Sequence, residues 1–396
     1  MSADPGAGPP ERSAAKAPAK NLPVTTISPN TRQSGTSDPG AGPPERSAAK
    51  APAKNLRVTT ISPNTRQSGT SDPGAGPPER SAAKAATESR RVALKVDCDT
   101  YVGTREGIPA LLDVFAKRGI RATFFFTLGP DRSGVAARRV FTRKGFLKKM
   151  LRSKAGSLYG FPTVVYGTLL PAPRIGERCE AEIRSAAAAG HDAGVHAWDH
   201  VGWHDGLDRW TAAKVREEVA RAHAEFRRIL GFDADASAAA GWTANAVSLE
   251  AESERKLAYT SNTRGGTPFF PRAGGRVFPT LDVPSTLPTL DETLEWETLG
   301  SDTAQRDWYR AAVRGTEVHT IHTEIEGRSK RRLFEEILDS WIADGVRFPT
   351  LRDLAGEALA GRADVPVRDL LRTTLEGRGG TVATGWPSVA RAPGDR

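Results

Sequence analysis

The order of apolar segments predicts an α/β fold for residues 89–360. Arg91–Asp97 is a short apolar run typical of a buried strand, Glu106–Arg118 has apolar residues at helical spacing, and Ala122–Thr127 is a second strand-like run. A strand, a helix and a strand within about 35 residues form a βαβ unit, in which the two strands pair in parallel. Because such units recur along the chain, we expect a closed or nearly closed barrel, with an open sheet as the alternative.

The segments that follow continue this alternation, less regularly after Gly231. Further strands are predicted at Ala193–Val195, Ser237–Ala240, Tyr259–Asn262 and Glu317–His322. Further helices are predicted at Glu177–Ala189, Thr211–Leu230, Val247–Glu254, Gln305–Arg314, Lys330–Asp344 and Leu351–Leu359.

Both ends of the chain differ in composition from this region. Residues 1–88 contain a near-exact 34-residue repeat whose copies begin at Asp4, Asp38 and Asp72. The copies have the length of a tetratricopeptide unit, but they lack the large apolar residues that stacked helix pairs need. Pro, Gly, Ala, Ser and Lys dominate, so we expect residues 1–88 to be disordered. Residues 361–396 are rich in Arg, Gly, Thr and Pro and are predicted to be a second flexible tail.

Targeting signals and cysteine content indicate the cellular compartment in which the protein is expected. The sequence has no continuous apolar segment of the kind that a secretory signal or a membrane-spanning helix requires. Cys98 and Cys179 are too few for a disulfide framework, and Cys98 is most simply a core thiol that faces away from the neighbouring aspartates. We therefore expect the folded region to stay on the cytoplasmic side.

The net charge of +9 is unevenly distributed. Residues 1–88 hold part of the excess, and Arg138–Lys154 holds eight basic residues and no acidic one. The rest of the chain is net negative. This distribution argues against a nucleic-acid partner, because the folded region has no broad basic surface outside one short segment.

The stretch His191–His200 contains two histidines, His196 and His200, at a spacing of four residues. On a strand their rings would lie about 13 Å apart. On a helical turn or a tight bend they would lie about 5 to 6 Å apart, close enough to share one metal ion. The alternative is a pair of ordinary surface or core histidines, so the site needs a third ligand.

Candidate partners lie at the ends of two other predicted strands. Asp97 and Asp99 follow the first strand and share one face, about 7 Å apart, so that Asp99 could bind a metal while Asp97 stands beside a bound water. His322 ends a later strand. The alternative for the aspartates is a solvated loop. However, side chains at the carboxyl ends of barrel strands converge on one opening, which favours a single site.

These motifs resemble those of the polysaccharide deacetylases, the NodB-homology family. Asp97 and Asp99 match the first motif, and the resemblance implies that Asp97 is the base and Asp99 a metal ligand. His196 and His200 match the two metal-binding histidines of the second motif. His322 matches the histidine that protonates the leaving amine. The resemblance covers roughly residues 90–358 and implies a distorted (β/α) barrel.

Longer strings resemble one branch of this family, the deformylases of a lipid-linked aminosugar. They are VDCDTYVGTREGIPALL, KMLRSKAGSLYG, GVHAWDH, SAAAGW and TIHTEIEG. The branch implies hydrolysis of the formamide on undecaprenyl-phosphate-linked 4-formamido-4-deoxy-L-arabinose, a step of lipid A modification linked to polymyxin resistance. It also implies one divalent metal ion. Two histidines and one carboxylate admit zinc, cobalt, manganese, nickel or iron.

The sequence departs from the family pattern at the third motif. An arginine that pairs with the base aspartate is usual there, but this chain reads Ser237–Trp242, SAAAGW. We take Arg264 as the candidate that orients Asp97, with a plain surface arginine as the alternative. Asp291 is the candidate partner of His322. Glu324 and Glu326 follow His322 closely enough to touch the substrate, or they lie in a solvated turn.

The basic segment predicts where the protein works. Within residues 138–170, an apolar helical face flanked by bases would dock on the anionic inner-membrane leaflet, at its cytoplasmic face, as a peripheral protein. The residues that would contact lipid are Arg143, Lys144, Phe146, Leu147, Lys148, Lys149, Met150, Leu151 and Arg152. The alternative for this segment is a helix packed on the barrel.

Two other functions remain open. One is N-deacetylation of another N-acylated sugar. The other is a non-catalytic module that binds an anionic surface. A protein built only for charge contact has no need of an aspartate pair, a histidine pair and His322 at strand ends, so we favour the enzyme.

Overall fold

The structure is a computed structural model that describes residues 90–135 and 166–387. The predicted disordered repeats, residues 1–88, and all nine predicted lipid-contacting residues lie outside the described residues. No helix in the described part of the chain is both long and apolar enough to cross a membrane.

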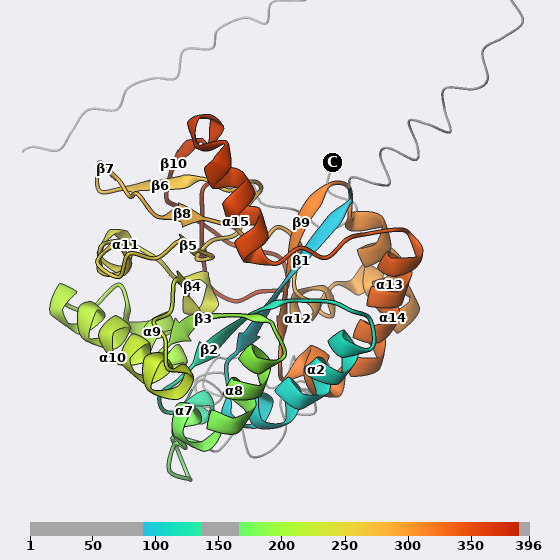
Figure 1. Cartoon of the computed structure of the whole chain (residues 1–396), viewed down its shortest axis with the longest axis horizontal. Helices are drawn as coiled ribbons and strands as arrows, with labels where there is room; N and C mark the ends of the chain where they lie inside the picture. The colour runs from blue at the N-terminus through green and yellow to red at the C-terminus, as the bar shows by residue number, and fades with distance from the viewer. Residues whose placement is uncertain (1–89, 136–165, 388–396) are drawn as a thin grey trace, which may run out of the picture. The chain divides into compact units, whose positions relative to one another are not determined.

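A seven-stranded, fully parallel sheet forms the centre of the fold (Figure 1). Its order is β8-β5-β4-β3-β2-β1-β9. The strands are β1 (Arg91–Cys98), β2 (Thr123–Thr127), β3 (Asp192–Ala197), β4 (Ala236–Ser237), β5 (Tyr259–Thr260), β8 (Leu281–Asp282) and β9 (Thr316–His322). The four longest strands, β1, β2, β3 and β9, lie side by side, and the two-residue strands form the other half of the sheet.

The sheet curls into a distorted barrel, as predicted. Strands β8 and β9 do not pair, but the chain after β8 approaches β9 and closes the gap. Thr286 and Leu287 both donate their backbone N–H groups to the carbonyl oxygen of Val318, at 3.0 and 3.1 Å. Closure by a loop explains why the barrel is irregular here, since a loop offers fewer ladder hydrogen bonds than a strand.

Helices cover the outside of this sheet (Figure 1). They are α2 (Ile108–Ala116), α7 (Ile175–Arg178), α8 (Glu180–Ala188), α10 (Ala212–Leu230), α11 (Ala246–Ser253), α13 (Asp302–Ala312) and α14 (Arg331–Ala343). Helix α15 (Leu351–Ala360) instead packs on the opposite face of the strands, where Leu351 and Leu354 join a cluster with Ala93 and Phe125. The longest, α10, begins where the Thr211 side chain accepts a hydrogen bond from the Lys214 N–H. It ends at Gly231, whose φ of 81° suits a residue without a Cβ. Both signals are local, and the predicted bounds Thr211–Leu230 match.

Short elements lie in the connections. They are α9 (His200–Gly206), α12 (Leu290–Thr293), the 3₁₀ turns η2 (Ala240–Trp242), η3 (Glu297–Leu299) and η5 (Arg362–Asp364), and the π-helical turns η1 (Gly103–Gly107) and η4 (Ile325–Ser329). Strands β6 (Phe270–Ala273) and β7 (Arg276–Val277) form a hairpin, which β10 (Val367–Asp369) extends into a three-stranded sheet.

The register of the long strands brings polar groups together at one end. Asp97 of β1 lies beside His322 of β9 on one side and beside Phe125 of β2 on the other. The Cys98 thiol, which follows Asp97, is buried in the apolar core together with Val96 and Phe126. Because β1 is parallel to both neighbours, polar residues at the ends of three strands meet at the same edge of the barrel.

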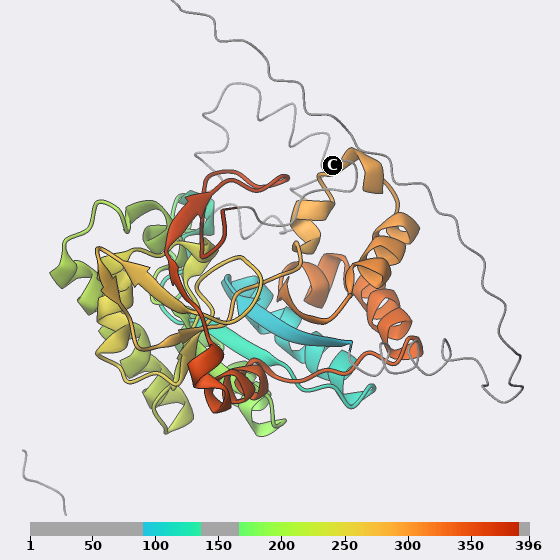
Figure 2. The same cartoon turned by 90° about the horizontal axis from the view of Figure 1, so that it is seen from above.

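The expectation of a flexible tail from residue 361 is wrong for residues 361–387. Strand β10 pairs with β6, and β11 (Leu371–Thr373) pairs with β12 (Val382–Thr384). Val382 and Ala383 are buried, and the Ala383 carbonyl oxygen accepts a hydrogen bond from the Arg264 N–H. Figure 2 shows this segment, in red, leaving α15 and crossing the molecule. Its few apolar residues pack against the rest of the protein, a contact that the composition of the segment alone does not show. Residues 388–396 lie outside the described part.

Candidate active site

Three side chains from the ends of β1 and β3 form a metal-binding group. Asp99 directly follows β1, His196 lies in β3, and His200 is the first residue of α9. His196 Nε2 lies 3.2 Å from Asp99 Oδ1, and His200 Nε2 lies 3.4 Å from Asp99 Oδ2. One ligand atom from each residue falls within 4.8 Å of the other two. The structure thus brings together the three residues that the sequence predicts as ligands.

The local chain path explains the histidine geometry. Asp199 caps α9, and its carboxylate accepts a hydrogen bond from the Gly202 N–H at 2.8 Å. The chain therefore turns from strand to helix between the two histidines, which places their ring centroids 5.2 Å apart. On a continuous strand they could not share an ion.

The charge states of these residues suit a divalent cation. Burial lowers the pKa of His200 to about 4, so its ring is neutral near pH 7 and keeps a lone pair for a metal. Burial acts to raise the pKa of Asp99, but His200 and His196 outweigh it and hold this pKa well below its usual range. Asp99 Oδ1 is buried without a hydrogen-bond partner among the described residues. These residues therefore fit one divalent metal ion.

Asp97 lies next to this group and is paired with a buried lysine. Asp97 Oδ2 lies 4.0 Å from His196 Nε2 and accepts a hydrogen bond from Lys95 Nζ at 3.0 Å. The Lys95 side chain is fully buried, and that of Asp97 is 4% exposed. Asp97 Oδ1 has no hydrogen-bond partner within the described ranges, so one oxygen is held while the other is free for a proton.

The sequence analysis missed Lys95. A signal was present, because a lysine two residues before Asp97 on a buried strand must share its face. Arg264, which we expected to orient Asp97, does not do so, and that expectation is wrong. Its guanidinium donates two hydrogen bonds to the Glu292 carboxylate, at 2.8 and 3.1 Å, and a third to the Leu287 carbonyl oxygen.

Trp242, from the third motif, connects these charged groups. Its ring lies 5.0 Å from Lys95 Nζ and 4.7 Å from the guanidinium carbon of Arg264. Its indole N–H donates a hydrogen bond to Ser285 Oγ at 3.0 Å. The third motif, which has no arginine here, thus contributes a tryptophan that packs against the lysine holding Asp97.

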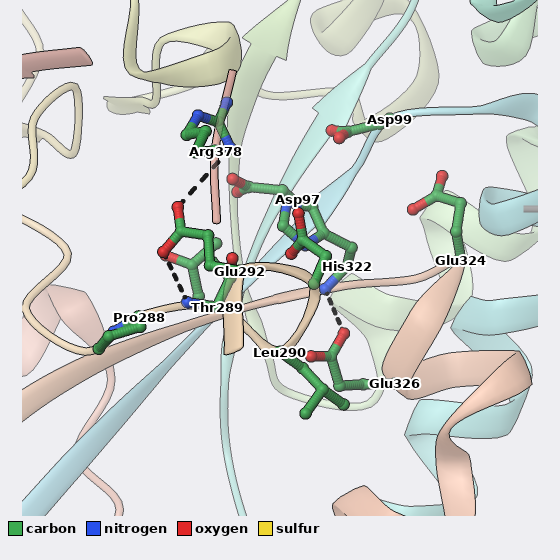
Figure 3. A network of polar contacts seen from close by, with 12 residues as sticks. Asp97, Asp99, Pro288, Thr289, Leu290, Glu292, His322, Glu324, Glu326 and Arg378 are labelled. Atoms are coloured by element: carbon green, nitrogen blue, oxygen red, sulfur yellow. Dashed lines mark hydrogen bonds and ion pairs between the residues drawn. The ribbon is translucent and has the colours of Figure 1, made fainter. Parts of the chain in front are cut away.

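His322 lies on the other side of the site, at the end of β9. Its Nδ1 is 3.5 Å from Asp291 Oδ1, so the structure places the predicted partner beside it. Its backbone N–H donates to Glu326 Oε2 at 2.8 Å (Figure 3). Burial lowers the pKa of His322, but the Asp291 and Asp99 carboxylates outweigh that effect and raise this pKa to about 9. The ring is therefore protonated near pH 7.

Glu324 and Glu326 do not lie in a solvated turn, because both side chains are buried. They are 1% and 0% exposed. Glu324 Oε1 accepts hydrogen bonds from the N–H and the hydroxyl of Thr100, at 2.8 and 2.6 Å. Burial raises the pKa of Glu326 to about 8. Through these hydrogen bonds Glu324 holds the chain at the end of β1, and Glu326 holds the end of β9.

Sequence comparison relates this chain to known proteins. Residues 84–259 match the family model described as polysaccharide deacetylase. The chain is 38% identical over 297 residues to a protein from Shewanella sediminis and 32% identical over 287 residues to one from Wigglesworthia glossinidia brevipalpis. Both are named "Probable 4-deoxy-4-formamido-L-arabinose-phosphoundecaprenol deformylase". The alignments cover 73% and 71% of this chain, and 93% and 98% of those proteins.

A solved structure gives a weaker match. It is a crystal structure of a protein from Mycobacterium smegmatis that is assigned to the polysaccharide deacetylases, with a TM-score of 0.49 and 17% sequence identity. The match covers 73% of this chain and 96% of that one. On the sequence comparisons, this chain belongs to the polysaccharide deacetylase family, in the group that includes the two deformylases.

Proposed function

We propose that this protein is a metal-dependent amide hydrolase. It removes the formyl group from undecaprenyl-phosphate-linked 4-formamido-4-deoxy-L-arabinose and releases formate and the free aminosugar lipid. The observation that carries the proposal is the convergence of Asp99, His196 and His200 beside Asp97, with His322 on the neighbouring strand. The substrate comes from the names of the two relatives. The reaction belongs to lipid A modification and polymyxin resistance.

The side chains divide the reaction into two proton transfers. A divalent ion held by Asp99, His196 and His200 would polarise the formamide carbonyl and activate a water molecule. Asp97 accepts the proton of the attacking water, while Lys95 holds its second oxygen in place. His322 enters the reaction protonated, with its Nδ1 side facing Asp291, and gives a proton to the sugar nitrogen as the C–N bond breaks.

Several metals fit these ligands. Two imidazoles and one carboxylate suit zinc, and cobalt, manganese, nickel and iron accept the same donor set. We propose that the resident ion is one of these five, and that a single ion is bound per chain.

The place of action is also a proposal. The substrate is an anionic lipid, and residues 138–154 carry eight bases and no acid. Each base near an anionic surface contributes about 1 kcal/mol of attraction. We propose that the protein acts as a peripheral enzyme at the cytoplasmic face of the inner membrane, with this segment against the anionic leaflet.

Formate release from the purified formamido lipid tests the function. We expect the protein to deformylate this lipid and to act much more slowly on the N-acetyl analogue, because the acetyl methyl group must fit where formamide has a hydrogen. Mass spectrometry of both lipids after equal incubation measures the two rates. Faster loss of acetyl than of formyl would contradict the proposal in favour of a general N-deacetylase.

The Asp291–His322 pair predicts a pH effect. Because the pKa of His322 is raised to about 9, the acid form is present below that pH and is lost as pH rises through it. Asp291→Asn removes a carboxylate that raises this pKa, so the alkaline limb of the kcat profile should move to lower pH. An Asp302→Asn variant, which changes an exposed carboxylate paired with Lys330, should leave the limb in place. An unmoved limb in Asp291→Asn would show that His322 is not the titrating acid.

A further inference from the structure

Three cations surround the Trp242 ring, and the two arginines among them have no role in the chemistry described above. Arg378, from the loop between β11 and β12, places its guanidinium carbon 4.7 Å from the ring centre. Lys95 and Arg264 are the other two. Figure 3 shows Arg378 next to Glu292, with Asp97, Asp99 and His322 in the same close-up.

Arg378 differs from its two neighbours in exposure and in partners. Its side chain is 18% exposed, whereas those of Arg264 and Lys95 are 2% and 0% exposed. In the described part of the chain its one ion-pair partner is Glu292 Oε1, at 3.8 Å, which is too long for a hydrogen bond. Its guanidinium N–H groups are therefore available to a ligand.

Glu292 is already satisfied without Arg378. Its two carboxylate oxygens accept hydrogen bonds from Arg264, and Oε2 accepts a further one from the Thr289 N–H at 3.1 Å. Arg264 and Arg378 thus share one carboxylate. The group of Arg264, Arg378 and Glu292 therefore has one excess positive charge, at the more exposed Arg378. Such an arrangement favours an anionic ligand that touches Arg378.

The backbone holds Arg378 in a fixed place. Gly377 has a φ of 79°, and a Cβ there would lie 2.3 Å from the Glu292 carbonyl oxygen, so the chain passes directly against α12. The bond between Arg264 N–H and Ala383 oxygen fastens the same segment farther along. Gly241 lies close to both His204 and Arg378, since a Cβ there would lie 2.5 Å from His204 Cδ2 and 3.3 Å from Arg378 Nη2. Arg378 therefore lies on a segment that packs against the rest of the protein.

We propose that Arg378 binds the phosphodiester anion of the lipid-linked sugar and so selects a phosphate-linked substrate. The inference rests on the proposed function. The phosphodiester and the formamide lie on opposite sides of one sugar ring, and Trp242 borders both Arg378, at 4.7 Å, and His322, with ring centroids 6.5 Å apart. A sugar whose nitrogen is near His322 can thus place its phosphate near the guanidinium, whose paired donors match two phosphate oxygens.

The test measures deformylation by the Arg378→Gln variant with two substrates. One is the undecaprenyl-phosphate-linked formamido sugar, and the other is the uncharged methyl glycoside of the same sugar. Charge-assisted hydrogen bonds of this kind correspond to about 10- to 100-fold in affinity. We expect kcat/KM for formate release to fall by about that factor with the phosphodiester and to change by less than about twofold with the glycoside. Arg378→Lys should retain part of the difference.

Arg372→Gln is the matched control. It removes an arginine of the same segment, one that pairs with Asp208 at 2.6 Å away from the Trp242 cluster, and it should affect neither substrate. An equal loss on both substrates in Arg378→Gln, or no loss on either, would overturn the assignment.

Direct binding separates this inference from the proposed function. Calorimetric titration of metal-free wild type and Arg378→Gln with the phosphodiester lipid needs no turnover. We expect about 10-fold weaker binding by the variant, with an unchanged thermal unfolding midpoint. Equal affinities would overturn the role of Arg378 whether or not formate is released. Failure of the wild type to release formate, with the affinity difference intact, would count against the proposed function alone.

Discussion

Asp97→Asn is expected to lower formate release by about 10²- to 10⁴-fold while the protein still binds its metal ion. The amide keeps the shape of the carboxylate but cannot accept the proton of the attacking water. Asp97 is not one of the three residues whose ligand atoms fall within 4.8 Å of each other, so ion binding should survive. Turnover and metal content are measured on the same preparation.

Asp99→Asn makes the same substitution at the aspartate that we assign as a metal ligand. It should lose most of the bound ion, because Asp99 is the residue that contacts both histidines, at 3.2 and 3.4 Å. Equal metal loss in the two variants would show that the base and the ligand have been assigned the wrong way round.

Lys95→Met is expected to destabilise the metal-free protein by about 3 kcal/mol or more, because it leaves a buried carboxylate without its counter-charge. The Asp97 side chain is 4% exposed and has Lys95 Nζ at 3.0 Å. Turnover should fall as well, since Asp97 loses the contact that fixes its orientation. Urea unfolding of the metal-free protein measures the stability.

The double variant Lys95→Met with Asp97→Asn separates loss of the pair from loss of packing. It should be more stable than Lys95→Met alone, because no uncompensated charge remains. Lys117→Met, which removes a 62% exposed lysine from a surface ion pair, should leave stability almost unchanged. A Lys95→Met protein as stable as the wild type would show that the pair does not hold Asp97.

Much of the fold could be predicted because its signals are local. The strand Arg91–Asp97 and the helix Thr211–Leu230 are visible from apolar runs, a cap and a terminal glycine, and the structure has them as β1 and α10. The cluster of Asp97, Asp99, His196 and His322 followed from one topological fact, that parallel strands end at one edge. Their distance in the sequence does not matter once the strand order is fixed.

The parts that the sequence did not reveal depend on contacts between distant segments. The partner of Arg264 is Glu292, and nothing in the local sequence of either residue shows that a buried ion pair joins them. The segment after α15 has the composition of a tail, yet it packs because β6 offers a strand edge and Trp386 meets Phe269, with ring centroids 5.2 Å apart. Such edges and surfaces exist only after the barrel has formed.

Titration of the metal-stripped protein tests most directly whether the ion at Asp99, His196 and His200 is required for deformylation. Formate release from the lipid substrate is followed while zinc, or another of the five candidate ions, is added to protein freed of metal by a chelator. We expect no activity at the start and a return that saturates at one ion per chain, with no recovery in His196→Ala. Full activity in the stripped protein, or in stripped His196→Ala, would contradict the metal-dependent mechanism.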